Sequence, residues 1–125
     1  MTRNRKSART AGTRFERQIA DALAAALEDD RIDRRVKNGA KDRGDIGGIR
    51  VRGERLVIEA KNCTRVALPE WIREAHTAAG HDDALLGVVV SKRHGVGDPM
   101  KQWVHMELGD LVALTTGEPQ DGRYE

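Results

Sequence analysis

Apolar residues recur at helical spacing in the first quarter of the chain. Four of them follow one another at four-residue steps, which is typical of the buried face of an amphipathic helix. Thr13 suits the N-cap and Glu16 follows three residues later, as in a capping box, so we expect a helix over residues 13–28. The apolar residues of this face are Phe15, Ile19, Leu23 and Leu27.

Short strands are predicted after this helix. Residues 49–52 and 55–61 are predicted to be strands, the second apolar over 56–58, and Gly53 and Glu54 between them suit a tight hairpin turn. Residues 31–38 show a weaker alternation. We therefore expect three strands before the next helix.

The middle of the chain predicts a parallel crossover. Pro69 suits the first turn of a second helix, which should end at Gly80. Residues 84–91 form a continuous apolar and β-branched run, which is typical of a buried central strand. A strand, a helix and a strand in this order imply a right-handed parallel connection between 55–61 and 84–91.

The last elements are a short strand over 103–106 and a closing helix over 107–114. We expect Leu108, Leu111 and Val112 to face inward on that helix. The predicted order is α-β-β-β-α-β-β-α. This order describes a mixed β-sheet flanked by helices, an α/β or α+β fold.

The composition fits one folded domain. The chain has 125 residues, 38% hydrophobic and 34% charged, and no run near the ~18 apolar residues that a membrane span needs. Residues 1–11 are polar and basic, so we expect a flexible basic arm there and a single domain over 12–125. The basic N-terminus has no apolar segment behind it, as a secretory signal would. Cys63 alone excludes a disulfide or a cysteine-based zinc site within the chain, so we expect a cytoplasmic protein.

Charge is distributed unevenly along the chain. The formal net charge is only +2, but residues 1–17 and 31–55 carry +5 each, whereas 18–30 and 56–125 carry −4 each. Sixteen of the 22 basic residues are arginine, whose planar guanidinium pairs well with phosphate. Two basic segments on a near-neutral protein indicate a face that binds a polyanion such as DNA.

The strand over 55–61 ends in a pair of opposite charges. Glu59 and Lys61 are two residues apart, so they project from the same face of the strand. Burying them is costly unless they are paired or bind something. Asp45 returns to the same neighbourhood if the hairpin folds back, and two converging carboxylates would suit Mg²⁺. A lysine beside that ion could orient or deprotonate the attacking water, or stabilise the phosphate charge.

This arrangement requires an irregular strand. A regular ladder from a turn at Gly53 and Glu54 would place Asp45 on the opposite face from Glu59. One extra residue, most simply at Gly47 or Gly48, restores the shared face, as would a longer turn. We therefore predict a bulge or irregularity between Asp45 and Ile49.

Glu16 lies on or beside the apolar face of the first helix. A carboxylate there needs a partner. One explanation is the capping box or an ion pair with a neighbouring arginine such as Arg17. The other is a third acidic group near the metal.

Three motifs together resemble the PD-(D/E)xK nuclease superfamily. They are residues 12–17 on the first helix, residues 44–46, and residues 59–61, which read Glu-Ala-Lys. The resemblance covers roughly residues 12–92, and size and arrangement are most similar to archaeal and phage Holliday junction resolvases. Gly44 stands where the superfamily name has proline.

The resemblance implies a restriction-endonuclease-like fold and a Mg²⁺ site, with Mn²⁺ as a substitute. By the residues that match, Asp45 and Glu59 would bind the ion together with the carbonyl of Ala60. Lys61 would assist the attacking water, and Glu16 would complete the acidic site, directly or through water. The implied form is a homodimer acting on branched or duplex DNA inside a bacterial cell, encoded by the host or by a phage.

The resulting hypothesis is a Mg²⁺-dependent, structure-selective DNA endonuclease, nearest to a Holliday junction resolvase, that hydrolyses phosphodiesters by metal-assisted attack of water. Two alternatives stay open. The first is a restriction-like, repair or replication nuclease with the same catalytic core and another DNA substrate. The second is a small nucleic-acid-binding protein without enzymatic activity.

The residues expected to bind DNA are basic and come from the arm, from the segment before Asp45, and from the loop after residue 91. No membrane partner is expected, and without a Walker A motif no nucleotide cofactor is expected. His76 and His81 have no acidic or cysteine partner at metal-binding spacing, which favours a structural role. The predicted DNA-binding residues are Arg3, Arg5, Lys6, Arg9, Arg14, Arg34, Arg35, Lys37, Lys41, Arg43, Lys92 and Arg93.

Overall fold

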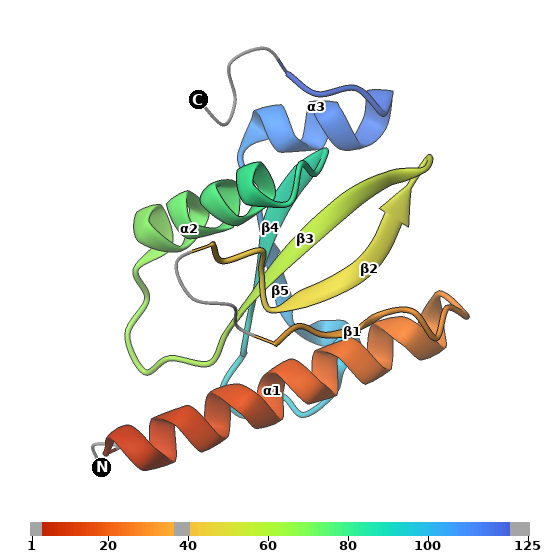
Figure 1. Cartoon of the computed structure of the whole chain (residues 1–125). Coiled ribbons are helices and arrows are strands. Elements are labelled where there is room, and N and C mark those ends of the chain that lie inside the picture. The colour runs from red at the N-terminus through yellow and green to blue at the C-terminus, as the bar shows by residue number, and fades with distance from the viewer. Residues whose placement is uncertain (1–3, 37–40, 121–125) are drawn as a thin grey trace.

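A five-stranded mixed sheet lies between helices in this protein (Figure 1). The structure is a computed structural model that describes residues 4–36 and 41–120. The predicted class, a mixed sheet flanked by helices, is confirmed. In chain order the elements are α1 (Arg5–Ala26), β1 (Asp33–Arg34), β2 (Ile46–Val51), β3 (Glu54–Lys61), α2 (Leu68–His81), β4 (Leu86–Ser91), the 3₁₀ helix η1 (Pro99–Lys101), β5 (Trp103–His105) and α3 (Leu108–Thr116).

The strands follow one another across the sheet in chain order, from β1 to β5. Strands β3 and β4 are parallel, and the other neighbours are antiparallel. The predicted parallel crossover through α2 is therefore confirmed. All six residues of β4 are buried, as the continuous apolar run over 84–91 predicted.

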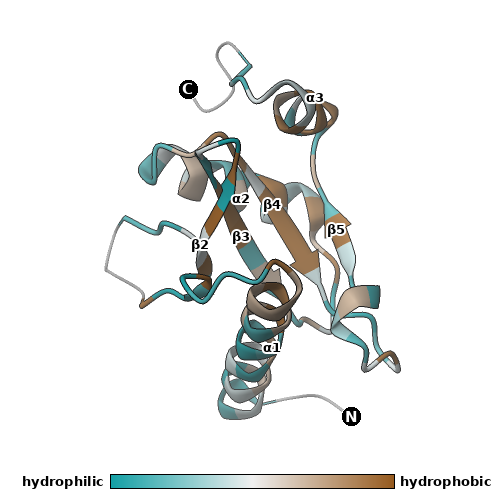
Figure 2. Ribbon diagram, turned by 90° about the vertical axis from the view of Figure 1, so that its right-hand side faces the viewer, coloured by the Kyte–Doolittle hydropathy of each residue, from teal (hydrophilic) through white to brown (hydrophobic). Residues whose placement is uncertain are grey.

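Helices α1 and α2 cover opposite faces of the sheet. Phe15 and Ile19 of α1 belong to one cluster with the even-numbered residues Ile58 and Val88. Trp71 and Ala75 of α2 pack instead with Val89, and successive strand residues point to opposite faces. In Figure 2, apolar colouring continues along β4 between these layers. Glu59 and Lys61 are odd-numbered, so they lie on the α2 face.

Helix α1 begins earlier than predicted. It starts at Arg5, and the side chain of Asn4 caps it by accepting a hydrogen bond from the Ser7 amide at 2.8 Å. The prediction of an N-cap at Thr13 was therefore wrong. From Arg5 onward, the segment expected to be a flexible arm is helical, and residues 1–3 lie outside the described residues. Within the described ranges, no helix combines the length and apolarity needed to cross a membrane.

Helix α3 faces the core with a different side than predicted. Leu108, Leu111 and Val112 are exposed, whereas Asp110 and Ala113 are buried. Apolar residues occur around most of this helix (Figure 2), so its periodicity does not identify the inner face. The carboxylate of Asp110 takes the inner side in place of Leu108 and Leu111, and it has hydrogen-bond partners there.

Candidate active site

The predicted irregularity in β2 is present. Strand β2 pairs with β3 from Val51↔Glu54 to Ile49↔Leu56, and the register then shifts so that Ile46 pairs with Ile58. The turn is centred on Arg52 and Gly53, one residue earlier than expected. The shift accommodates Gly47 and Gly48 and places Asp45 beside the end of β3.

Two glycines make this path sterically feasible. Gly48 has a φ of +88°, and a Cβ there would lie 2.2 Å from the carbonyl oxygen of Arg31. Gly44 has a φ of +96°, and a Cβ there would lie 2.3 Å from Cγ1 of Val57. Proline, whose φ is near −65°, cannot adopt the conformation of residue 44.

The backbone and the side chain of Asp45 both bind β3. The Asp45 amide donates to the Ile58 carbonyl at 2.9 Å, and Oδ2 of Asp45 accepts from the Ala60 amide at 2.9 Å. Asp45 is 4% exposed and Glu59 is 3% exposed. The two carboxyl groups share a hydrogen bond, and Oε1 of Glu59 is buried without a hydrogen-bond partner. The structure thus brings Asp45 and Glu59 together, as predicted.

Burial and negative neighbours make Glu59 a weak acid. Burial is the largest cause, followed by the charge and hydrogen bond of Asp45 and the charge of Asp42; together they raise the pKa of Glu59 to about 9. The charge of Lys61 offsets them only in part. Glu59 therefore carries a proton at neutral pH until a cation balances the site.

Lys61 lies on the same face and is held by α2. Its Nζ donates to Oε2 of Glu74 at 2.5 Å. Burial acts to lower the pKa of Lys61, but the hydrogen bond and charge of Glu74, with the charges of Glu59 and Asp45, outweigh burial and raise it. Lys61 is therefore a cation at neutral pH, which favours a charge-stabilising role over that of a base.

The donor set fits a hard divalent cation. Two buried carboxylates converge, and an oxygen of Glu59 has no partner, a costly arrangement that a bound cation would relieve. Mg²⁺ prefers oxygen ligands, usually one or two carboxylates with several waters. Asp45 and Glu59 supply these ligands, and the predicted contribution of the Ala60 carbonyl stays a prediction.

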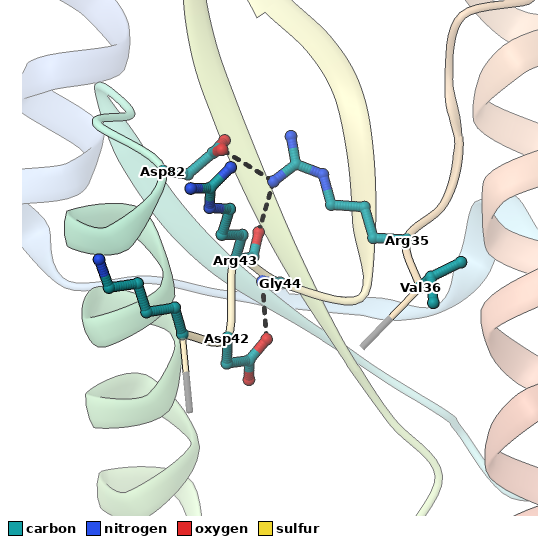
Figure 3. A pocket seen from close by; sticks show the side chains of 7 residues that line it. Arg35, Val36, Asp42, Arg43, Gly44 and Asp82 are labelled. Atoms are coloured by element: carbon teal, nitrogen blue, oxygen red, sulfur yellow. Dashed lines mark hydrogen bonds and ion pairs between the residues drawn. The ribbon is translucent and has the colours of Figure 1, made fainter. Parts of the chain in front are cut away.

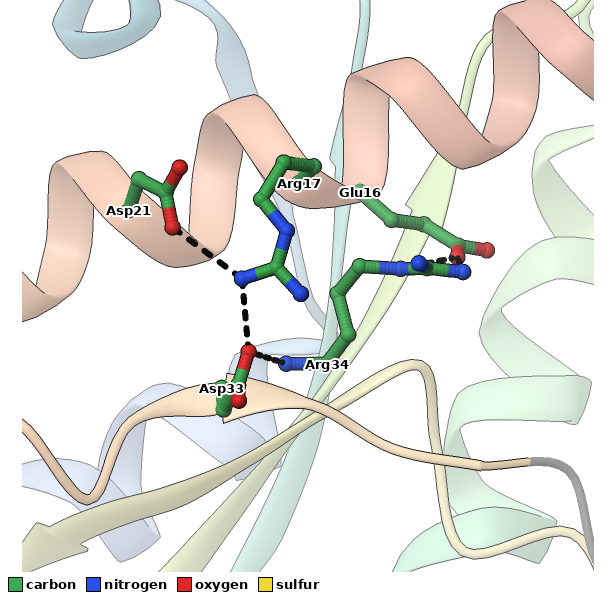
Figure 4. Close-up of polar contacts among 5 residues, drawn as sticks. All are labelled: Glu16, Arg17, Asp21, Asp33 and Arg34. Carbon is green, nitrogen blue, oxygen red and sulfur yellow. Dashed lines mark hydrogen bonds and ion pairs between the residues drawn. The ribbon is translucent and has the colours of Figure 1, made fainter.

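Glu16 has a partner that the sequence did not indicate. Its Oε2 accepts from Nη2 and Nε of Arg34 at 3.1 and 3.2 Å (Figure 4). Arg17 instead pairs with Asp21 and Asp33. Glu16 therefore forms an ion pair with an arginine, as one explanation predicted, but the arginine is Arg34 and not Arg17. The predicted role of Glu16 at the metal stays a prediction.

A basic pocket adjoins the segment that leads to Asp45 (Figure 3). It has a volume of about 240 Å³, and Lys41 and Arg43 are among its lining residues. Arg35 is not fully available there, because its Nη1 pairs with Asp82 at 2.9 Å and donates to the Arg43 carbonyl at 2.8 Å. Lys41 and Arg43 thus line a pocket formed by the segment that precedes Asp45, and their role in binding DNA stays a prediction.

The other predicted DNA-binding residues are dispersed. Arg5, Lys6, Arg9 and Arg14 lie on α1, where Arg9 lines a groove of about 800 Å³ that also contains Glu16 and Arg34. Nζ of Lys92 donates to the carbonyls of Arg93 and Val96. Arg3 and Lys37 lie outside the described residues.

Sequence reasoning missed two acidic neighbours of the site. Asp42 adds negative charge near Glu59, and its Oδ1 accepts from the Gly44 amide at 2.9 Å. Glu74 anchors Lys61. Glu74 could have been identified from the sequence. It follows Trp71 by three residues and precedes Ala78 by four, and residues at these spacings lie on the same face of a helix. Asp42 carries no comparable signal.

A second polar cluster joins α2 to α3. Nε2 of His76 lies 2.9 Å from Oδ2 of Asp110, which also accepts from the Glu107 amide at 2.9 Å. The ligand atoms of His76, Glu107 and Asp110 all lie within 4.8 Å of one another, a spacing that a metal site also shows. The capping box of α3 and the contact with α2 explain this proximity. These acidic partners are too distant in sequence to have been predicted.

No protein-family model, curated protein or solved structure matches the chain. Functional inference therefore depends on the residues of the site and their geometry.

Proposed function

We propose that this protein is a Mg²⁺-dependent DNA endonuclease of the PD-(D/E)xK type, with branched DNA such as a Holliday junction as its substrate. The observation that supports this most is the register shift in β2. It places Asp45 beside Glu59 and leaves a buried oxygen of Glu59 without a partner. A buried oxygen without a hydrogen-bond partner lowers stability, and a cation bound between the two carboxylates would offset that loss.

Each side chain has a role that follows from its environment. Asp45 and Glu59 would hold Mg²⁺, and Glu59 would release its proton when the ion binds. The bound ion would supply Lewis acidity and charge neutralisation for phosphodiester hydrolysis. Lys61, oriented by Glu74, would stabilise negative charge that develops on the phosphate. Lys41 and Arg43 would draw the DNA backbone toward the carboxylates.

The test is cleavage of matched DNA substrates. A four-way junction, a flap and a linear duplex of shared sequence would be incubated with the wild type in Mg²⁺ or in EDTA. We expect paired nicks in the junction with Mg²⁺ and none with EDTA. Equal cutting of the linear duplex would indicate another nuclease, and no cutting of any substrate would contradict the proposal.

Two variants test the assigned roles. Asp45→Asn and Lys61→Ala should each lower the cleavage rate by about 100-fold or more while DNA affinity changes little. Asp83→Asn is the matched control, because Asp83 is exposed and asparagine tolerates its φ of +51°. Lys101→Ala removes an exposed lysine elsewhere. A similar loss in these controls would argue against a specific site.

A further inference from the structure

Three adjacent strands place Lys61 and a tryptophan in one row. Lys61 of β3 pairs with Ser91 of β4, and Ser91 pairs with Trp103 of β5. Directly paired residues project from the same face of a sheet, so Trp103 lies on the face of Glu59 and Lys61. Two interstrand spacings of ~4.8 Å separate the backbones of Trp103 and Lys61 by about 10 Å.

Trp103 is exposed but held in place. It is 55% exposed, and the guanidinium carbon of Arg93 lies 4.0 Å from its ring centroid. Arg93 is itself fixed, because its Nη1 donates to the Lys101 carbonyl at 3.0 Å and its amide donates to Oε1 of Gln102 at 2.6 Å. A flat aromatic ring with a fixed cation is a surface on which nucleobases stack.

A groove connects this ring to the candidate active site. It has a volume of about 400 Å³, and Lys61 and Trp103 both line it. Its polar groups include Oγ of Ser91, which lies 2.7 Å from Nε2 of His105. The buried ring of Trp71 lies near His105, with a centroid separation of 6.3 Å. Cationic and aromatic groups therefore line a path that leads from Lys61.

We propose that Trp103, supported by Arg93, stacks on an unpaired nucleobase of the strand that is cut. This inference rests on the proposed nuclease function. With the ~3.4 Å rise of stacked DNA, the separation of about 10 Å between Lys61 and Trp103 corresponds to roughly three nucleotides. Bases in continuous duplex are already stacked on their neighbours. The substrate class is therefore DNA with an unstacked base near the cut, as at a branch point, a bulge or a frayed end.

A contact between two copies of the chain is the competing explanation for an exposed tryptophan. The shared row and groove with Lys61, and the arginine on the ring, favour a nucleic acid. An aromatic ring about 10 Å from Lys61 lies within a few nucleotides of a phosphate bound beside that lysine. A subunit contact has no need of that alignment.

Binding without cleavage tests the proposal. In EDTA, the affinity for a fluorescent duplex with a three-nucleotide bulge would be compared with that for the same duplex without a bulge. Trp103→Ala should weaken bulge binding about 5- to 20-fold and duplex binding less than twofold, and Trp103→Phe should retain most of the preference. Val104→Ala is the matched control, because Val104 is 56% exposed on the opposite face of β5 and its loss should change neither affinity.

Three outcomes are decisive. Equal affinities of wild type and Trp103→Ala for the bulged duplex would overturn the inference. So would an unchanged DNA preference accompanied by altered sedimentation, which would identify Trp103 as a subunit contact. A Trp103-dependent preference in a protein that cuts no DNA with Mg²⁺ would support base stacking and contradict the endonuclease proposal, so the two failures are distinguishable.

Discussion

Two buried carboxylate clusters lie on the α2 side of this protein, and they differ in how well they are satisfied. Asp110 is fully buried, and its Oδ2 has hydrogen-bond partners on both α2 and α3. Asp45 and Glu59 are almost as buried, yet they face each other and leave an oxygen of Glu59 unpartnered. The first cluster resembles a structural joint, whereas the second keeps capacity for a ligand.

The difference shows which property marks a functional group. Burial alone does not distinguish Asp110 from Glu59. Geometric proximity of metal-binding atoms does not either, because His76, Glu107 and Asp110 satisfy that criterion. What separates Glu59 from Asp110 is a buried carboxyl oxygen without a hydrogen-bond partner, which lowers stability and which a bound ligand could compensate.

The largest contrast should be in catalysis. Glu59→Gln should lower the rate of Mg²⁺-dependent cleavage by about 100-fold or more, because it removes a charge that would hold the ion. Asp110→Asn should change the rate of the folded protein only a few-fold. Single-turnover cleavage of a four-way junction, at a temperature where both variants are folded, measures this. Equal losses would remove the distinction between the clusters.

Stability should show the opposite order. Asp110→Ala should lower the free energy of unfolding by about 2–4 kcal/mol, because it empties a fully buried position and removes the partner of the half-buried His76 ring and of the Glu107 amide. Urea unfolding monitored by circular dichroism measures this change. Asp30→Ala, at an exposed site, should remain within about 0.5 kcal/mol of the wild type. A similar value for both would mean that the joint between α2 and α3 contributes little.

The register shift can be tested with two glycines of similar conformation. Gly48 and Gly95 have φ values of +88° and +83°, but only a Cβ at Gly48 would meet the backbone of Arg31. Gly95→Ala should cost about 1 kcal/mol from backbone strain, and Gly48→Ala should cost about 2 kcal/mol more. Gly48→Ala should also lower cleavage, because Asp45 would move. Equal costs in urea unfolding would show that β2 tolerates another path.

The pH dependence of stability should be the smallest and most specific effect. The pKa of Glu59 is raised from 4.5 to about 9, so between these pH values the folded protein keeps a proton that the unfolded chain has released. The free energy of unfolding of the metal-free protein should therefore fall as pH rises through this window. Glu59 contributes at most ~1.4 kcal/mol per pH unit to this slope, and above the window it contributes no further slope.

Urea unfolding in EDTA from pH 5.5 to 8.5 measures this slope. Glu59→Gln should reduce it and should be more stable than the wild type at pH 8.5, whereas Glu70→Gln, at an exposed site, should keep it. Added Mg²⁺ should flatten the slope of the wild type but not that of Glu59→Gln. If the free energy of unfolding of Glu59→Gln fell with pH as steeply as that of the wild type, other groups would be the cause of the slope.

Local signals predicted much of the fold. The hairpin before Lys61 and the crossover to β4 follow from turn residues and from an apolar β-branched run. The bulge at Gly47 and Gly48 followed from a requirement of the proposed site, because Asp45 had to share a face with Glu59. Asn4 and Ser7 also carry a helix-start signal that was overlooked, and the polar residues after them are acceptable in a helix.

The remaining features depend on contacts between distant residues. His76 and Asp110 are 34 residues apart, and Arg34 and Glu16 are 18 apart, so neither pair shows a spacing rule. The inner face of α3 was mistaken for the same reason. Asp110 is inside because α2 supplies a partner, and the hydropathy of α3 does not show this.

The early start of α1 changes how its basic residues would meet a polyanion. A helix of 22 residues is about 33 Å long, and it carries Arg5, Lys6 and Arg9 at set positions. A flexible arm loses about 1–2 kcal/mol of conformational entropy for each residue that becomes ordered on binding. A preformed helix avoids that loss. The contribution of these charges would then depend on the helicity of residues 5–11 as well as on ionic strength.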